Sequence, residues 1–106
     1  MIARNVTMRL KVNSVADFIQ TLEKEVLPLL RKQKGFEDEI AFVGPFGREA
    51  IGISFWDKQE NAETYSRGSY AEVLKVLAKV IDGTPEVRTW DVCNSTVHKI
   101  AAAAAA

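Results

Sequence analysis

The junction within residues 51–65 constrains the fold of this chain most strongly. Residues 51–56 form a strand-like apolar run that ends on Trp56, and Asp57 follows at once. The composition then changes to a polar segment with one aromatic residue, Tyr65, which is typical of a surface helix. The sequence therefore predicts a strand that passes directly into a helix. This junction places Trp56 and Tyr65 near the mouth of any pocket between a sheet and its helices.

Alternating apolar residues predict β-strands elsewhere in the chain. In residues 5–12 every second side chain is apolar, which is the period of a strand with one face in a core. The last predicted strand is rich in Val, Thr and Trp, residue types that favour strands. Residues 44–47 predict a turn and residues 82–85 predict a loop, because both combine glycine with proline. The expected strands are residues 5–12, 36–43, 48–56 and 86–96.

Apolar residues at steps of three and four predict two helical regions, the second of them broken. The first follows Ser14, whose spacing to Asp17 indicates a capping box, and it ends at Gly35. Pro28 lies inside this region and should kink it, because proline removes a backbone donor. The expected helices are residues 15–34, 58–67 and 70–81, capped by Ser14, Asp57 and Ser69.

The order of these elements, β-α-β-β-α-β, predicts an α+β fold of the ferredoxin-like kind. Such a fold has a four-stranded antiparallel sheet with both helices on one face. The other face stays uncovered, and here it would carry many apolar side chains, which usually marks an interface. We therefore expect a homodimer through the open sheet face, formed by a single domain in residues 1–100. Residues 101–106 are a poly-alanine tail, too short for an isolated helix in water.

Composition and charge exclude several classes of partner. The chain has 106 residues, and 14 Lys plus Arg balance 14 Asp plus Glu without a long basic cluster. This balance argues against nucleic acid and against an anionic membrane as partners. No stretch approaches the roughly 20 apolar residues of a membrane span, and the first residues do not resemble a signal peptide. We expect a cytoplasmic protein whose partners are small molecules or a second copy of itself.

Few residues outside the aromatic set could carry chemistry. Cys93 is the single cysteine, so no intrachain disulfide can form, and we interpret it as a small buried side chain. His98 is the single histidine and lies near the end of the chain, where we expect it to be solvated. Asp38 and Glu39 should point to opposite faces of a strand and therefore cannot act as a pair. No metal ligand set is expected.

Four segments of the chain together resemble a known family. They are residues 27–30 (Leu-Pro-Leu-Leu), residues 34–36 (Lys-Gly-Phe), the strand 51–56 with the acidic residue that follows it, and the last strand, 87–97. In these segments the chain resembles the antibiotic biosynthesis monooxygenase-like family of dimeric α+β barrels, over about residues 3–98. For the activity, the resemblance implies two alternatives. One is cofactor-independent oxygenation of phenolic polyketides or hydroquinones, and the other is haem degradation.

The oxygenase alternative implies a pocket in which an Asn, a Trp and Tyr side chains hold a planar aromatic substrate. The matching catalytic residues are Asn5, Trp56 and Tyr65. Asn5 and Tyr65 would polarise the substrate, and Trp56 would stack on it. The resemblance implies a small phenolic or quinol-type ligand and no cofactor. The expected substrate-binding residues are Tyr70, Phe55 and Trp90.

Each of these residues also has a structural interpretation. A tryptophan at a strand–helix junction often packs in the core, and Asn5 shares the parity of the polar strand residues. Tyr65 and Tyr70 could cover a core edge, and Trp90 could belong to the dimer interface. The second functional hypothesis is therefore a non-catalytic ligand-binding or structural dimer.

Haem degradation is disfavoured by the sequence. The haem-degrading relatives need an axial histidine on the second helical region, and residues 70–81 contain none. His98 lies beyond the last predicted strand and does not occupy the matching place. Tyr65 stands about where those relatives carry a tryptophan.

Overall fold

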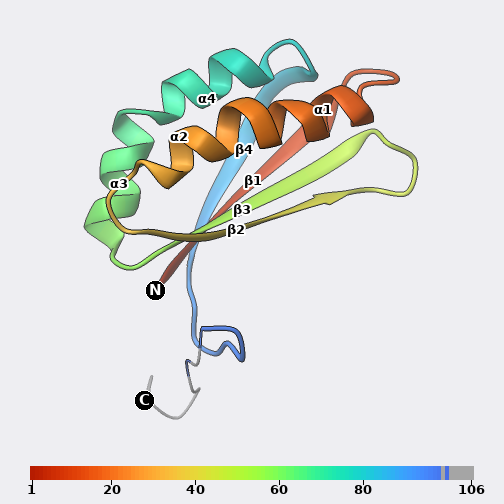
Figure 1. Cartoon of the computed structure of the whole chain (residues 1–106). Coiled ribbons are helices and arrows are strands. Elements are labelled where there is room, and N and C mark those ends of the chain that lie inside the picture. Colours follow the sequence, from red (N-terminus) through yellow and green to blue (C-terminus); the bar gives the residue numbers. More distant parts are fainter. Residues whose placement is uncertain (99, 101–106) are drawn as a thin grey trace.

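The chain forms a four-stranded antiparallel sheet whose described helices lie on one face (Figure 1). The structure is a computed structural model that describes residues 1–98 and 100, so the predicted poly-alanine tail lies outside the described residues. The strands are β1 (Ile2–Leu10), β2 (Phe36–Val43), β3 (Glu49–Trp56) and β4 (Ile81–Asp91). The helical elements are α1 (Val15–Thr21), the π-helical turn η1 (Leu22–Val26), α2 (Leu27–Arg31), α3 (Gln59–Arg67) and α4 (Tyr70–Leu77). This order confirms the predicted ferredoxin-like α+β fold.

Strand pairing decides which side chains lie under the helices. The strand order is β2-β3-β1-β4, so β2 and β4 are the edges. Arg4 pairs with Ser54 and both are buried, whereas Asn5 pairs with Ile53 and both are partly exposed. Side chains alternate along a strand and paired residues share a face. The even-numbered residues of β1 and β3 therefore point to the helices, on the covered face, and the odd-numbered residues point to the open face.

The first helical region is interrupted next to Pro28. The turn η1 separates α1 from α2, and the N–H of Leu27 donates to the carbonyl of Leu22, five residues earlier. Pro28 follows directly and has no N–H to offer the preceding turn. The missing donor explains why the regular ladder is lost here, and the predicted interruption is confirmed. Among the described residues, no helix has the length and the apolar composition needed to cross a membrane.

The fourth strand differs most from its prediction. The loop predicted at residues 82–85 is wrong, because β4 runs through them. A register shift between Thr7 and Arg9 of β1 absorbs the irregular stretch. Pro85 is tolerated because β4 is an edge strand, where a missing backbone donor breaks no central ladder. Other predicted ends also differ: α4 ends at Leu77, β4 ends at Asp91, and β1 spans Ile2–Leu10.

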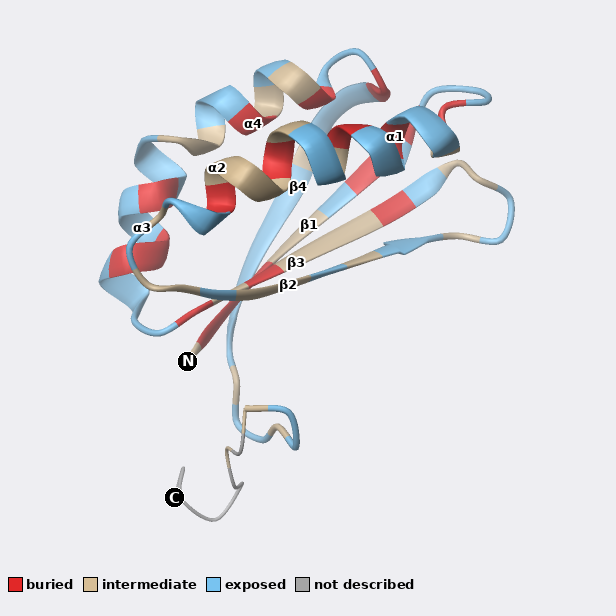
Figure 2. Cartoon of the chain, in the orientation of Figure 1, coloured by how far each residue is buried: buried red, intermediate tan, exposed pale blue. Residues whose placement is uncertain are grey.

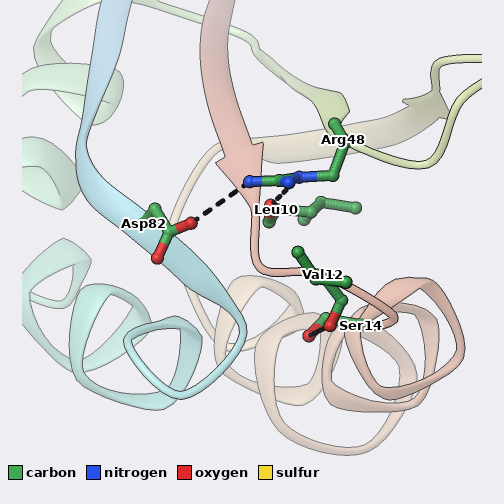
Figure 3. Close-up of polar contacts among 5 residues, drawn as sticks. All are labelled: Leu10, Val12, Ser14, Arg48 and Asp82. Atoms are coloured by element: carbon green, nitrogen blue, oxygen red, sulfur yellow. Dashed lines mark hydrogen bonds and ion pairs between the residues drawn. The ribbon is translucent and has the colours of Figure 1, made fainter.

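The helices begin close to the predicted places, but the predicted side-chain caps do not form. Ser14 and Ser69 directly precede α1 and α4, yet neither side chain bonds to its helix. The Ser14 hydroxyl instead donates to the carbonyl of Val12 at 3.4 Å (Figure 3). The Asp57 carboxylate does not cap α3 but accepts a hydrogen bond from Asn61 Nδ2 at 2.8 Å. The helix starts therefore depend on burial of an apolar face more than on caps.

Arg48 joins three strands at one end of the sheet (Figure 3). It directly precedes β3, and its Nε donates to the carbonyl of Leu10, at the end of β1, at 2.8 Å. The N–H of Leu10 donates back to the carbonyl of Arg48 at 2.8 Å. Its Nη2 lies 3.5 Å from Oδ2 of Asp82 in β4, an exposed pair that adds little stability by itself. Arg48 thus connects the start of β3 to the end of β1 and, more weakly, to β4.

The core lies between the covered face and the helices, where Figure 2 shows the buried residues of both layers. Trp56 is 0% exposed and its indole N–H donates to Ser54 Oγ at 2.9 Å. The buried nitrogen is therefore satisfied inside the protein. Trp56 is a core residue, in agreement with the structural interpretation of the strand–helix junction. Two other large side chains are as completely buried: Phe18 and Leu10.

Candidate functional site

A cavity of about 50 Å³ lies between the covered face and the helices. Its apolar roof comes from η1 and α4: Leu22, Val26, Val73 and Leu77. Its polar lining groups belong to Arg4, Glu39, Ser54, Tyr65 and Tyr70. π-Helical turns are rare and often occur at functional sites. A partly open pocket that combines an apolar roof with convergent polar groups is the candidate functional site.

Stacked aromatic rings form one wall of the cavity. The ring of Tyr65 stacks on Trp56 with centroids 4.8 Å apart and 28° between the planes. Tyr70 tilts against Tyr65 at 5.9 Å. Burial raises the pKa of Tyr65 to about 12, although the positive charge of Arg4 acts in the opposite direction. Tyr65 is therefore a neutral phenol near pH 7, able to donate a hydrogen bond, and Trp56 holds its ring in place.

Arg4 is a buried cation in the cavity wall. It is only 3% exposed, and its guanidinium carbon lies 3.9 Å from the ring centroid of Tyr70 and 5.3 Å from that of Tyr65. Its one hydrogen bond within the described residues is a long contact from Nη2 to Ser66 Oγ at 3.5 Å. No carboxylate of the described residues lies within ion-pair distance. Buried arginines are normally paired with a carboxylate. Arg4 instead lies against two aromatic rings.

Glu39 reaches the cavity from the edge strand β2. It pairs with Ser54 and so lies on the covered face. Burial, with a smaller contribution from Asp38, raises its pKa. Asp38 pairs with Phe55 on the open face, which confirms the predicted separation of the two carboxylates. Glu39 also lines a wider surface cleft of about 310 Å³ between α1, η1 and β2, and it therefore stands between the cavity and solvent.

The structure separates the six predicted site residues into two groups. Tyr65 and Tyr70 line the cavity, and Trp56 supports Tyr65 from the core. The predicted shared pocket of Asn5 with Trp56 and Tyr65 is wrong, because the sheet lies between them. Asn5 points to the open face, where its Nδ2 donates to Thr7 Oγ1 at 3.3 Å. Two predicted substrate-binding residues share that face with it: Phe55 and Trp90.

The histidine and the cysteine lie away from the cavity. His98 packs on Phe55 with ring centroids 5.5 Å apart, and its Nε2 lies 3.7 Å from Asp38 Oδ2. His98 is thus partly covered at the open face. The prediction that it is solvated is wrong. Cys93 is exposed, so its predicted burial is wrong, because β4 ends two residues before it. In the part of the chain that the structure describes, no group of His, Cys, Asp and Glu side chains could hold a metal ion.

Sequence reasoning missed Arg4 and Glu39. Arg4 shares the parity of the apolar residues of β1, and a charged residue at an apolar position is a usable signal once the strand is extended to Ile2. Glu39 gives a weaker signal. A register shift after Phe36 interrupts the alternation of β2, so parity counted from the strand start does not reveal its face.

The sequence matches no protein-family model and no curated protein. The fold, however, is similar to solved structures. The ActVA-Orf6 monooxygenase of Streptomyces coelicolor, in complex with nanaomycin D, is 13% identical, with a TM-score of 0.74 over 89% of this chain and 88% of that one. SnoaB, a cofactor-independent oxygenase from Streptomyces nogalater, is 8% identical, with a TM-score of 0.70 over 90% of this chain and 95% of that one.

A candidate antibiotic biosynthesis monooxygenase from Bordetella bronchiseptica is similar to the same extent. It is 14% identical, with a TM-score of 0.73 over 86% of this chain and 95% of that one. These likenesses show that the chain has the fold of the antibiotic biosynthesis monooxygenase-like proteins, as its sequence predicted. At such identities the likeness concerns the fold, so the chemistry has to be argued from the site.

Proposed function

We propose that this protein is a cofactor-independent monooxygenase that oxidises a small phenolic or quinol-type substrate in the cavity between the covered face and the helices. The main observation in favour of the proposal is that one cavity is lined both by the aromatic rings of Tyr65 and Tyr70 and by the carboxyl group of Glu39, whose pKa is raised. The fold supports the kind of reaction, because two proteins of similar structure are named as a monooxygenase and a cofactor-independent oxygenase.

The residues of the cavity would handle one proton and orient one ring. The Glu39 carboxylate accepts the phenolic proton, and neutral Tyr65 donates a hydrogen bond to the phenolate oxygen. The electron-rich phenolate then passes an electron to O₂, the two radicals combine, and loss of water leaves a quinone. One phenol and one O₂ give one quinone and one water, so the substrate supplies all the electrons. Trp56 acts only by positioning Tyr65, and Asn5 takes no part.

The size of the cavity favours a small substrate. A volume of about 50 Å³ is room for a few water molecules, whereas a cavity that binds benzene measures roughly 150 Å³, so even a single ring requires side chains of the lining to move. Sites for drug-sized ligands start at roughly 300 Å³. The neighbouring cleft of about 310 Å³ shares Leu22 and Glu39 with the cavity and offers a path for the substrate. A single-ring phenol therefore fits the proposal better than a fused polyketide.

Oxygen consumption with a panel of single-ring phenols and hydroquinones tests this proposal. We expect uptake by the wild type and a loss of about 100-fold in rate for Glu39→Gln, the usual size of a general-base effect. Glu37→Gln is the matched control, because Glu37 is an exposed glutamate on the same strand. Absence of uptake by well-folded protein across the panel would contradict the proposal, and so would full activity of Glu39→Gln.

A non-catalytic ligand-binding or structural dimer is the second candidate. The complete burial of Trp56 and the small cavity favour it, because both suit a packed shell. This hypothesis expects ligand binding without turnover, or no binding at all. Binding of a phenol with no oxygen uptake would therefore favour the second candidate over the first.

Under both hypotheses we propose that two copies associate through the open face. Ile40, Phe42 and Trp90 are 43%, 52% and 54% exposed there. Large apolar side chains gathered on one face of a sheet usually mark an interface. A face-to-face pairing of two sheets would bury them and leave the cavity, on the other side of each sheet, unchanged.

A further inference from the structure

Arg4 is a buried cation whose charge has no counterpart among the described residues. The residue is only 3% exposed, and its guanidinium carbon lies 3.9 Å from the ring centroid of Tyr70. The two carboxylates that line the surrounding spaces do not neutralise it. Glu39 takes its pKa shift from burial and Asp38, not from Arg4, and Glu63 accepts a hydrogen bond from Gln59 instead.

A guanidinium close to an aromatic ring can still bind a planar anion. The Arg4 guanidinium carbon lies 3.9 Å from the Tyr70 ring centroid, and the N–H donors of a guanidinium lie in its own plane, where a carboxylate can reach them. Within residues 1–98 and 100, the single hydrogen bond that Arg4 donates is the long one from Nη2 to Ser66 Oγ at 3.5 Å. Carboxylates match such a fork with two parallel hydrogen bonds. The lining also includes aliphatic side chains, among them Val6 and Val73, which would contact an apolar body.

We infer that Arg4 is a binding site for the carboxylate of a small acid with an apolar body, held in the cavity beneath η1 and α4. The inference rests on the proposed function only in placing the ligand in the same cavity. It deepens that function by naming the substrate class as phenolic acids rather than neutral phenols. The carboxylate bonds to Arg4, and the ring lies along the aliphatic roof.

Binding of benzoate and of benzamide, its neutral counterpart of the same shape, tests the inference. Isothermal titration under nitrogen removes any contribution from oxygen chemistry. We expect the wild type to bind benzoate at least about tenfold more tightly than benzamide, and Arg4→Met to bind both equally. Arg67→Met is the matched control, because it removes an exposed positive charge from neighbouring α3 and should keep the preference.

Equal binding of the two ligands by the wild type, no binding of benzoate, or an unchanged preference in Arg4→Met would overturn the inference. Should Arg4→Met fail to fold, Arg4→Gln decides the question. It removes the charge but keeps a polar side chain with hydrogen-bond donors, and the preference for benzoate should disappear. The proposed function fails separately: a carboxylate preference without oxygen uptake by phenolic acids refutes the oxygenase and leaves the anion site standing.

Discussion

The two faces of the sheet differ in the chemical character of their side chains. The covered face holds a buried cation, a carboxyl of raised pKa and stacked aromatic rings around a small cavity. The open face carries exposed apolar side chains such as Phe42 and Trp90, with polar Asn5 between them. Strand alternation places neighbours in sequence, such as Arg4 and Asn5, into different environments. The proposed chemistry and the proposed association therefore depend on different faces of the sheet.

The two tryptophans give the largest expected contrast between the faces. We expect Trp56→Ala to lower the free energy of unfolding by about 3 to 5 kcal/mol, because it removes a fully buried ring and its hydrogen bond. Trp90→Ala, on the open face, should change it by only about 0.5 kcal/mol in dilute protein. Urea denaturation followed by circular dichroism measures both. Similar losses for the two variants would contradict the assignment of their faces.

A charge on the open face should separate the proposed dimer without unfolding the chain. We expect Phe42→Asp to weaken self-association by at least about 30-fold, roughly 2 kcal/mol, because a carboxylate would be buried without a partner. Val12→Asp is the control, since Val12 is also exposed but lies in the turn after β1. Sedimentation equilibrium distinguishes the outcomes. A monomeric wild type at high concentration, or a Phe42→Asp dimer of normal strength, would exclude this interface.

Two glycines with positive φ test how closely the helix side is packed compared with an edge strand. Gly35 has a φ of 83°, and an added Cβ would collide with the side chains of Asp57 and Asn61. Gly83 in β4 has a φ of 69° with open space around it. We expect Gly35→Ala to destabilise by about 2 to 3 kcal/mol and Gly83→Ala by about 1 kcal/mol, in thermal or urea unfolding. Equal effects would mean that backbone strain alone matters at Gly35.

The pH dependence of stability should show the smallest effect. Because the pKa of Glu39 is raised in the folded state, the folded protein binds more protons than the unfolded chain just above pH 4.5. The contribution of Glu39 is therefore fully present below that pH and is lost as the pH rises through the folded pKa. Glu39→Gln should flatten this decline, whereas Glu37→Gln should leave it unchanged. A decline that is unaffected by Glu39→Gln would assign it to another group.

Most of the fold could be predicted because its periodicity is local. Strand β2 spans the predicted residues 36–43, and the interruption at Pro28 follows from proline's missing N–H. The start of β4 could not be predicted, since Gly83 and Pro85 are typical of turns in any local window. They are accepted in a strand only because β4 lies at the sheet edge and its register shifts against β1, which are properties of the assembled sheet.

The site was harder to predict than the fold because it depends on which face each residue joins. Tyr65 and Tyr70 line the cavity from their helices, whereas Asn5 lies on the open face, as the parity of the polar residues of β1 indicates. Arg4 could have been found, since an arginine at an apolar strand position is visible in the sequence. Glu39 could not, because its burial follows from a register shift in β2 and from the roof that η1 builds over it.

The complete enclosure of Trp56 and the exposure of Trp90 have an optical consequence. An indole in a dry, apolar site emits at shorter wavelengths than an indole in water. The emission of Trp56, on the covered face and in contact with Tyr65, should therefore be blue-shifted. The emission of Trp90, on the open face, should be red-shifted. A copy that covers the open face would shift only the second band, while a ligand that disturbs the aromatic wall would change the first. One emission spectrum can thus follow assembly and ligand binding as separate events in the unlabelled protein.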